Sequence, residues 1–292
     1  MKARLELTVI GWLLGVLGKA DPVAAKRGLE AIEGYLGRDE ALLEEGLIRF
    51  RGGNWAARYL AGANAHRLYG RDRGLALDTL RAAALDGDRR VREGAAWGYS
   101  HLLAERFDEV YPLFQALVRD PEERVRRAAV VALVPVIRGE DGARAEAALL
   151  LLEPLLTDGS FGVRKYIGPK VFSTMAERHP DLYMKHAASW AEREEELVRW
   201  HVAEGLAGTP PNHLDVALEL LRGLARDERV GVRRGVMRAL RELKYKAPER
   251  VDEEMERWAR EGLGEVAELV KAFRPSACRL RSRSRPPRRP WP

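Results

Sequence analysis

The residues with the clearest potential for chemistry are arginines that recur at a nearly constant spacing. A small or apolar residue followed by Arg occurs at Arg58, Arg92, Arg126, Arg164, Arg199 and Arg233, at intervals of 34, 34, 38, 35 and 34 residues. An Asp stands six residues before three of them, at Asp120, Asp158 and Asp227, and Asp88 stands four residues before Arg92. A guanidinium group binds phosphates or, through two parallel hydrogen bonds, a carboxylate.

Two interpretations of this pattern are open. A row of arginines along a groove would bind the phosphates of a nucleic acid. An Asp near a helix start and an Arg six residues later would instead satisfy turn amides and fix how neighbouring units stack. We expect the second, structural role for the following residues, which we call the ladder: Asp120, Arg126, Asp158, Arg164, Arg199, Asp227 and Arg233.

A separate basic segment is the stronger ligand candidate. Residues 222–246 hold nine basic and three acidic side chains. Arg234, Arg238 and Arg241 share one face of a predicted helix, opposite Val236 and Leu240, so guanidinium groups point away from the core. A solvated surface is the alternative. The candidate nucleic-acid-binding residues are Arg226, Arg229, Arg234, Arg238, Arg241 and Lys244.

The elements that position these side chains are predicted to be helix pairs. A repeat of 34 to 38 residues fits a pair of helices, and apolar helical segments such as 128–133 and 216–221 flank the Arg positions. Asp120-Pro121 has the composition of a helix start. We therefore predict an all-α protein, a right-handed α-solenoid of about 14 to 16 helices whose concave surface does the binding.

The repeat resembles that of the HEAT family, which belongs to the armadillo-like helical proteins, over residues 54–273. We predict one continuous solenoid, with an N-terminal helical cap at 1–53. Residues 274–292 hold seven Arg, five Pro and no acidic residue, so we predict a disordered tail there. Without this tail the chain carries 43 basic and 44 acidic residues.

Residues 187–258 resemble the HEAT-like DNA alkylation-repair proteins. The similar residues are Trp190, Val198-Arg199, Asp227, Val232-Arg233-Arg234, Leu240-Arg241-Glu242, Lys244 or Lys246, and Pro248-Glu249 with Val251. The resemblance implies an alkylpurine DNA glycosylase or damaged-DNA binder in which Trp190 and Glu194 contact the alkylated base. Glu194 stands where that family typically has Asp, and Arg238 where it often has an aromatic residue.

Other functions find little support in the sequence. It contains no phosphate-binding loop, nucleophile elbow or HExxH motif, and its six histidines stand singly. The single Cys278 cannot form an intramolecular disulfide. No apolar run is long enough to span a membrane. We therefore expect a cytoplasmic protein with no metal and no cofactor.

The N-terminal residues allow two interpretations. They loosely resemble a secretion signal, but Glu6 interrupts the segment and no small-x-small cleavage motif follows. At helical spacing, Leu5, Val9, Trp12 or Leu13, and Val16 fall on one face, which we expect to be buried in a first helix.

The sequence thus favours binding over catalysis. We predict a monomeric HEAT-repeat scaffold that binds a protein or a nucleic acid at its concave face, with the DNA alkylation-repair function as the alternative.

Overall fold

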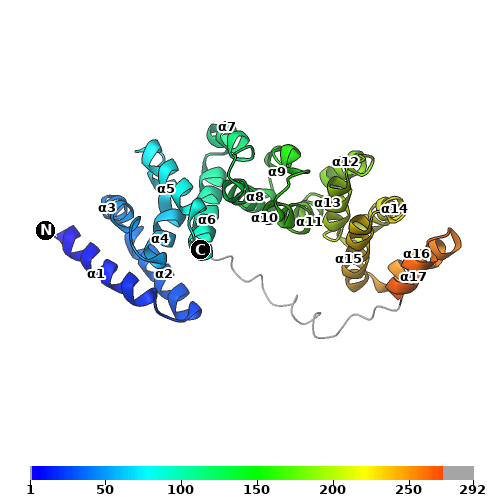
Figure 1. Ribbon diagram of the computed structural model, residues 1–292, viewed down its shortest axis with the longest axis horizontal. Coiled ribbons are helices and arrows are strands. Elements are labelled where there is room, and N and C mark those ends of the chain that lie inside the picture. Colours follow the sequence, from blue (N-terminus) through cyan, green and yellow to red (C-terminus); the bar gives the residue numbers. More distant parts are fainter. Residues whose placement is uncertain (1, 272–292) are drawn as a thin grey trace. The chain divides into compact units, whose positions relative to one another are not determined.

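The computed structural model of this chain describes residues 2–271, and within that range all regular structure is helical (Figure 1). The predicted all-α class is confirmed. The predicted tail at 274–292 lies outside the described residues. The chain divides into two compact units between Ala132 and Leu133, inside helix α8 (Glu123–Arg138). Nothing in the repeat pattern predicts a division at that position.

Several helices of the first unit contact both the next helix and the next but one. For example, α4 contacts α5 and α6, and α2 contacts α3 and α4. Within the unit this is the stacking of helix pairs that an α-solenoid requires. Its elements are α1 (Lys2–Leu17), α2 (Pro22–Leu36), α3 (Glu40–Phe50), α4 (Trp55–Asn64), the 3₁₀ turn η1 (Ala65–Leu68), α5 (Arg73–Leu85), α6 (Arg89–Glu105), α7 (Phe107–Leu117) and the start of α8.

The second unit repeats this arrangement: α13 contacts α14 and α15, and α14 contacts α15 and α16. A π-helical turn, η3, interrupts the first half of the unit. The elements after α8 are α9 (Gly142–Leu150), η2 (Glu153–Leu155), α10 (Phe161–Tyr166), η3 (Ile167–Phe172), α11 (Ser173–Arg178), α12 (Pro180–Ala191), α13 (Glu196–Leu206), η4 (Pro211–His213), α14 (Leu214–Ala225), α15 (Val230–Lys246), α16 (Pro248–Arg260) and α17 (Gly264–Lys271).

Polar residues just before the helices fix where many of them begin. The carboxylate of Asp21 accepts hydrogen bonds from the amides of Val23 and Ala24, with Pro22 at the first helical position. These bonds satisfy amides that have no partner inside the helix. The predicted helix start at Asp120-Pro121 is wrong by two residues, because α8 begins at Glu123 and Asp120 instead closes the preceding turn on the amide of Glu122.

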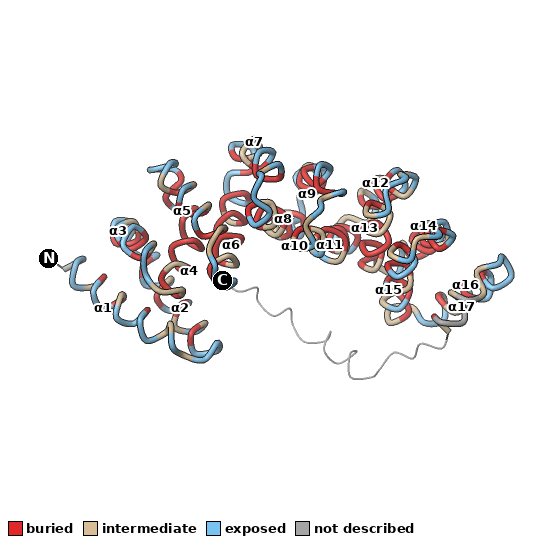
Figure 2. The backbone as a smooth tube through the Cα atoms, viewed as in Figure 1, coloured by how far each residue is buried: buried red, intermediate tan, exposed pale blue. Residues whose placement is uncertain are grey.

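The apolar residue before each repeated Arg belongs to the core. Val91, Val125, Val163, Val198 and Val232 are all 0% exposed, and Figure 2 shows the buried positions following the stacked helices. Close helix contact depends on small residues, since a Cβ on Gly98 of α6 would lie 2.2 Å from the carbonyl oxygen of Gly62 in α4. The repeated dipeptide thus places its first residue in the core and its Arg outside the core.

The burial predicted for the first helix is wrong. Leu7, Ile10 and Leu14 of α1 face α2, α3 and α4, so the apolar residues expected to be buried are exposed instead. Helix α1 is apolar on both sides, and spacing alone does not say which side meets the rest of the unit. No helix in the described part of the chain is long and apolar enough to cross a membrane.

Candidate functional site

The repeated arginines of the first unit bind the backbone of the turn that precedes them. Arg126 Nη1 donates to the carbonyl oxygens of Asp120 and Pro121 at 2.8 and 2.9 Å. Arg92 Nη1 does the same to Asp86 and Gly87, both at 2.8 Å. These hydrogen bonds satisfy turn carbonyls. This geometry is the one that the structural interpretation of the ladder requires.

The Asp of each turn binds an Arg from an earlier helix. Arg58 of α4 contacts Asp86 through two hydrogen bonds of 2.6 and 3.2 Å, and Arg81 of α5 binds the carboxylate of Asp120. Sequence reasoning missed Asp86, which stands six residues before Arg92, and singled out Asp88 instead. The Asp88 carboxylate accepts from the amide of Arg90 at the start of α6, and the Asp88 amide donates to the Asp86 carboxylate at 2.7 Å.

The turn at Asp227 in the second unit shows the complete pattern. The Arg199 guanidinium lies 2.7 Å from the buried carboxylate of Asp227, and Arg233 donates to the carbonyl oxygen of Asp227 at 3.2 Å. The hydrogen bond from Arg229 and the charge of Arg199 lower the pKa of Asp227 to about 2. Asp158 accepts from the amide of Ser160 at 2.7 Å, whereas Nε of Arg164 is buried without a partner.

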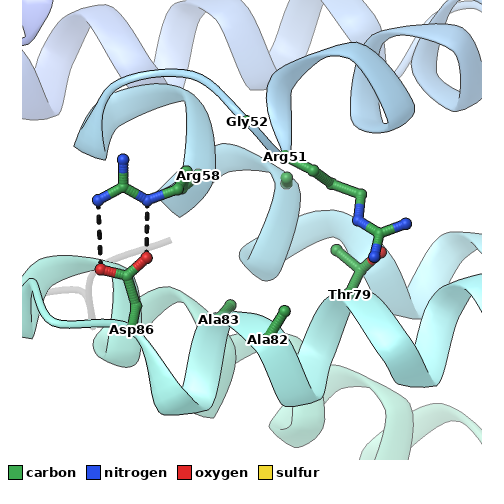
Figure 3. Close-up of a pocket in the computed structure, with 8 residues that line it drawn as sticks. Arg51, Gly52, Arg58, Thr79, Ala82, Ala83 and Asp86 are labelled. Atoms are coloured by element: carbon green, nitrogen blue, oxygen red, sulfur yellow. Dashed lines mark hydrogen bonds and ion pairs between the residues drawn. The ribbon is translucent and has the colours of Figure 1, made fainter.

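A cavity of about 310 Å³ lies beside the Arg58–Asp86 pair (Figure 3). Thr79, Ala82 and Ala83 of α5 line one side, with Arg51 and Gly52 opposite. Arg58 already binds Asp86 and, at 2.6 Å, the carbonyl oxygen of Gly53. The charges of Arg58 and Asp86 are therefore satisfied within the protein.

Most cations of the basic segment 222–246 are paired with carboxylates inside or near it. Arg229 binds Asp227, and its remaining Nη contacts the carbonyl oxygen of Glu194. The other ion pairs are Arg222–Glu261 at 3.0 Å, Arg226–Glu261 at 3.3 Å and Arg238–Glu204 at 2.5 Å. A guanidinium held by a carboxylate gains less from binding a phosphate, because the existing pair must be broken or shared.

Lys244 does not face solvent as a phosphate ligand would. Its ammonium group is buried, donates to the carbonyl oxygens of Val270 and Lys271 at 3.1 and 3.2 Å, and lies 2.7 Å from Asp252. Lys244 therefore holds the end of α17 against α15. Arg234 and Arg241, by contrast, are exposed on α15 as predicted.

Trp190 and Glu194 are not arranged as a base-binding pair. Trp190 is 5% exposed; its ring stacks on Phe172 at 4.8 Å and its Nε1 donates to Glu153 at 3.0 Å. Glu194 is exposed and lies in the turn after α12, so the two residues do not follow one another along a helix. A buried ring whose N–H is already bonded cannot stack on a nucleotide without local rearrangement.

Five large apolar residues of α1, in the first unit, are exposed. Leu5, Val9, Trp12, Leu13 and Val16 are 38 to 69% exposed. Their spacing of three or four residues places them along one side of the helix, opposite Leu7, Ile10 and Leu14. We call these five residues the α1 stripe. A contiguous exposed apolar surface of this kind typically marks a site of contact with another macromolecule.

Comparisons with known proteins add little to this picture. No protein-family model matches the chain, and no curated protein is significantly similar to it. Among solved structures, an engineered protein from the Northeast Structural Genomics Consortium is similar with a TM-score of 0.34 and 19% identity, over 80% of this chain and 98% of its own. A designed armadillo repeat protein in complex with the peptide (KR)4 gives a TM-score of 0.34 and 18% identity, over 72% of this chain and 97% of its own. Likenesses at this level say nothing of a ligand for this chain, so its class rests on its own geometry: an all-α protein built from stacked helix pairs.

Proposed function

We propose that this chain is a helical-repeat binding protein that docks a helical segment of a partner protein on the α1 stripe. The observation that supports this most is the exposure of five large apolar side chains on one face of a helix whose other face buries Leu7, Ile10 and Leu14. A helix with apolar residues on two sides is normally covered on both. Its own unit covers one side of α1, and the partner would cover the other.

The shape of the stripe suits a helix. With 16 residues, α1 is about 24 Å long, which is enough for three anchor positions of an amphipathic partner helix. Gly15 is exposed on this side, and a Cβ placed there would meet nothing within 4 Å, so a partner backbone has room to approach closely. Trp12 is a residue type that often contributes much of the binding energy in protein interfaces.

The alternative partner, a nucleic acid, has weaker support. Most of the basic segment is already paired, and Lys244 is buried. A DNA alkylation-repair function would also need Trp190 to leave its stack on Phe172. Arg234 and Arg241 are exposed on α15, as this alternative requires.

The proposal is tested by photo-crosslinking in cells of the source organism. A photoreactive phenylalanine analogue replaces Trp12, and illumination is expected to give a covalent adduct with one other protein, identified by mass spectrometry. The adduct should disappear when Val9→Glu and Val16→Glu are added, because buried charges oppose an apolar interface. With the purified partner, the same two substitutions should weaken binding at least tenfold.

Two controls distinguish binding at the α1 stripe from nonspecific contact with exposed apolar residues. The same photoreactive residue at Phe161, which is 68% exposed, should not give this adduct. Val216→Glu, at an exposed valine of α14, should leave the adduct at position 12 intact. An adduct that survives Val9→Glu and Val16→Glu, an adduct only with a second copy of this chain, or no adduct at all would refute the proposal.

A further inference from the structure

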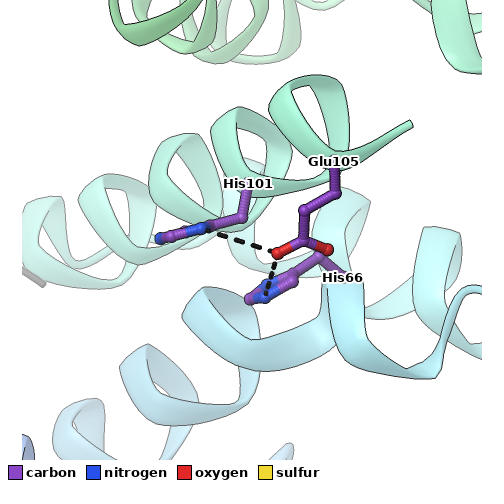
Figure 4. Close-up of side chains that lie close together, drawn as sticks. All are labelled: His66, His101 and Glu105. Atoms are coloured by element: carbon purple, nitrogen blue, oxygen red, sulfur yellow. Dashed lines mark ion pairs between the residues drawn. The ribbon is translucent and has the colours of Figure 1, made fainter. Parts of the chain in front are cut away.

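Three potential metal ligands that are far apart in the sequence meet in the first unit. His66 lies in η1, while His101 and Glu105 lie one turn apart at the end of α6 (Figure 4). Glu105 Oε1 is 3.6 Å from His66 Nε2 and 3.8 Å from His101 Nδ1. One ligand atom from each residue lies within 4.8 Å of the other two. Because the histidines are 35 residues apart, no sequence motif reveals the cluster.

The hydrogen bond that His66 makes leaves two acceptor atoms facing each other in this cluster. His66 Nδ1 lies 3.0 Å from the carbonyl oxygen of Ala63, which can only accept, so the ring proton belongs on Nδ1. With the proton on Nδ1, the Nε2 atom of the neutral imidazole carries a lone pair. That lone pair faces a carboxylate oxygen. Two acceptors 3.6 Å apart gain nothing from each other unless a cation lies between them.

The surroundings hold the two imidazoles in place but leave the cluster accessible. The rings of His66 and His101 stack at 4.8 Å, and Trp97 contacts the His101 ring edge-on at 4.9 Å. The backbone contact of His66 is the kind of bond that orients histidine ligands in metal sites. The side chains of His101 and Glu105 are 41 and 52% exposed, which leaves a path for an ion and room for bound water.

We propose that His66, His101 and Glu105 bind a divalent transition-metal ion such as Zn²⁺. Two neutral imidazoles and one carboxylate are a donor set that suits Zn²⁺, and nitrogen donors disfavour Mg²⁺ and Ca²⁺. In tetrahedral zinc sites ligand atoms lie about 3.3 Å apart, so the contacts to Glu105 need to close by only a few tenths of an ångström. The nearly parallel rings must tilt toward a common point. The positive charge of the exposed Arg67 opposes binding, and solvent screens it.

The test is isothermal titration of the metal-free chain with ZnCl₂, in a Cys278→Ser background that removes the only thiol. One Zn²⁺ per chain is expected, and excess MgCl₂ should not compete. His101→Gln and Glu105→Gln are each expected to weaken binding at least tenfold. Both side chains are about half exposed, so these variants should fold, and circular dichroism checks this. Co²⁺ should give visible absorption bands that both variants lose.

His186→Gln is the matched control. His186 lies 2.7 Å from Glu146 in the second unit, a histidine–carboxylate pair that lacks a second imidazole within the described residues. Zinc binding should be unchanged in this variant. No binding by the parent chain, or zinc affinity that is the same in the parent, His101→Gln and Glu105→Gln, would overturn the proposal.

Discussion

At the scale of single residues, the repeated Asp and Arg bind one another and the turns between helices. Arg126 satisfies two backbone carbonyls, and Asp227 accepts from Arg199 and Arg229. Arg126 and Asp227 therefore need no external ligand to be satisfied. Asp227 is the most informative of them, because its carboxylate is buried and its pKa is about 2. Its contribution to stability therefore depends on pH in a predictable direction.

Asp227→Asn should lower the free energy of unfolding at pH 7 by roughly 1–3 kcal/mol, because charge-assisted hydrogen bonds are lost from a buried position. The carboxyl has a usual pKa of 3.8 and about 2 in the folded chain. Its contribution is therefore complete above about pH 4 and is lost as the pH falls through about 2. Urea denaturation at pH 7, 4 and 2 measures the difference between the two proteins.

Asp181→Asn is the control for this measurement. Asp181 pairs with His213 at 3.0 Å, but its side chain is 91% exposed, so its replacement should change stability by less than about 0.5 kcal/mol. Equal losses in the two variants would contradict the role assigned to Asp227, as would a loss for Asp227→Asn that is the same at pH 7 and pH 2.

At the scale of elements, two helices differ from the sequence analysis: α1 in which of its sides is buried, and α15 in how many of its cations are free of partners from other helices. Apolar periodicity locates α1 but does not choose which of its two apolar sides is buried. Charge periodicity locates α15, and Arg234 and Arg241 are exposed as expected, yet Arg238 pairs with Glu204 and Lys244 is enclosed. A single sequence lacks the information that would place Glu204 or Asp252 beside these cations, because those partners come from other helices.

The two sides of α1 should respond differently to truncation. Leu14→Ala removes a side chain that is fully buried against the neighbouring helices and should cost about 2–5 kcal/mol of stability. Val16→Ala removes an exposed side chain and should change stability by less than about 0.5 kcal/mol, while weakening the partner binding proposed above. Thermal unfolding monitored by circular dichroism decides this. A large loss of stability for Val16→Ala would mean that the α1 stripe is covered within the chain.

At the scale of the whole molecule, the formal net charge of +6 does not describe residues 1–273. The seven arginines of residues 274–292 supply the excess, and the remaining chain is nearly neutral. Affinity for duplex DNA comes mainly from neutralised phosphates. The described residues therefore lack the strongly basic balance that dedicated DNA-binding domains usually have.

A chain that ends at residue 273 should bind duplex DNA weakly and with little dependence on salt. The full chain should bind more tightly, with a slope of log K against log salt no steeper than about −6, as seven cations allow. Fluorescence anisotropy with undamaged DNA and with DNA that contains an N-alkylated purine measures both. If the shortened chain prefers the lesion, the DNA alkylation-repair alternative is favoured, and Arg234 and Arg241 are the first residues to replace.

The sequence by itself determined the helical class, the repeat period and the residues that fill the core beside each repeated Arg. These follow from local spacing, because each helix pair repeats the same apolar pattern within 34 to 38 residues. The tertiary structure decided which side of α1 is covered, that Trp190 stacks on Phe172, and that His66 meets His101 and Glu105. Each of these depends on side chains from different helices coming together, and the periodicity of one helix does not specify its neighbours.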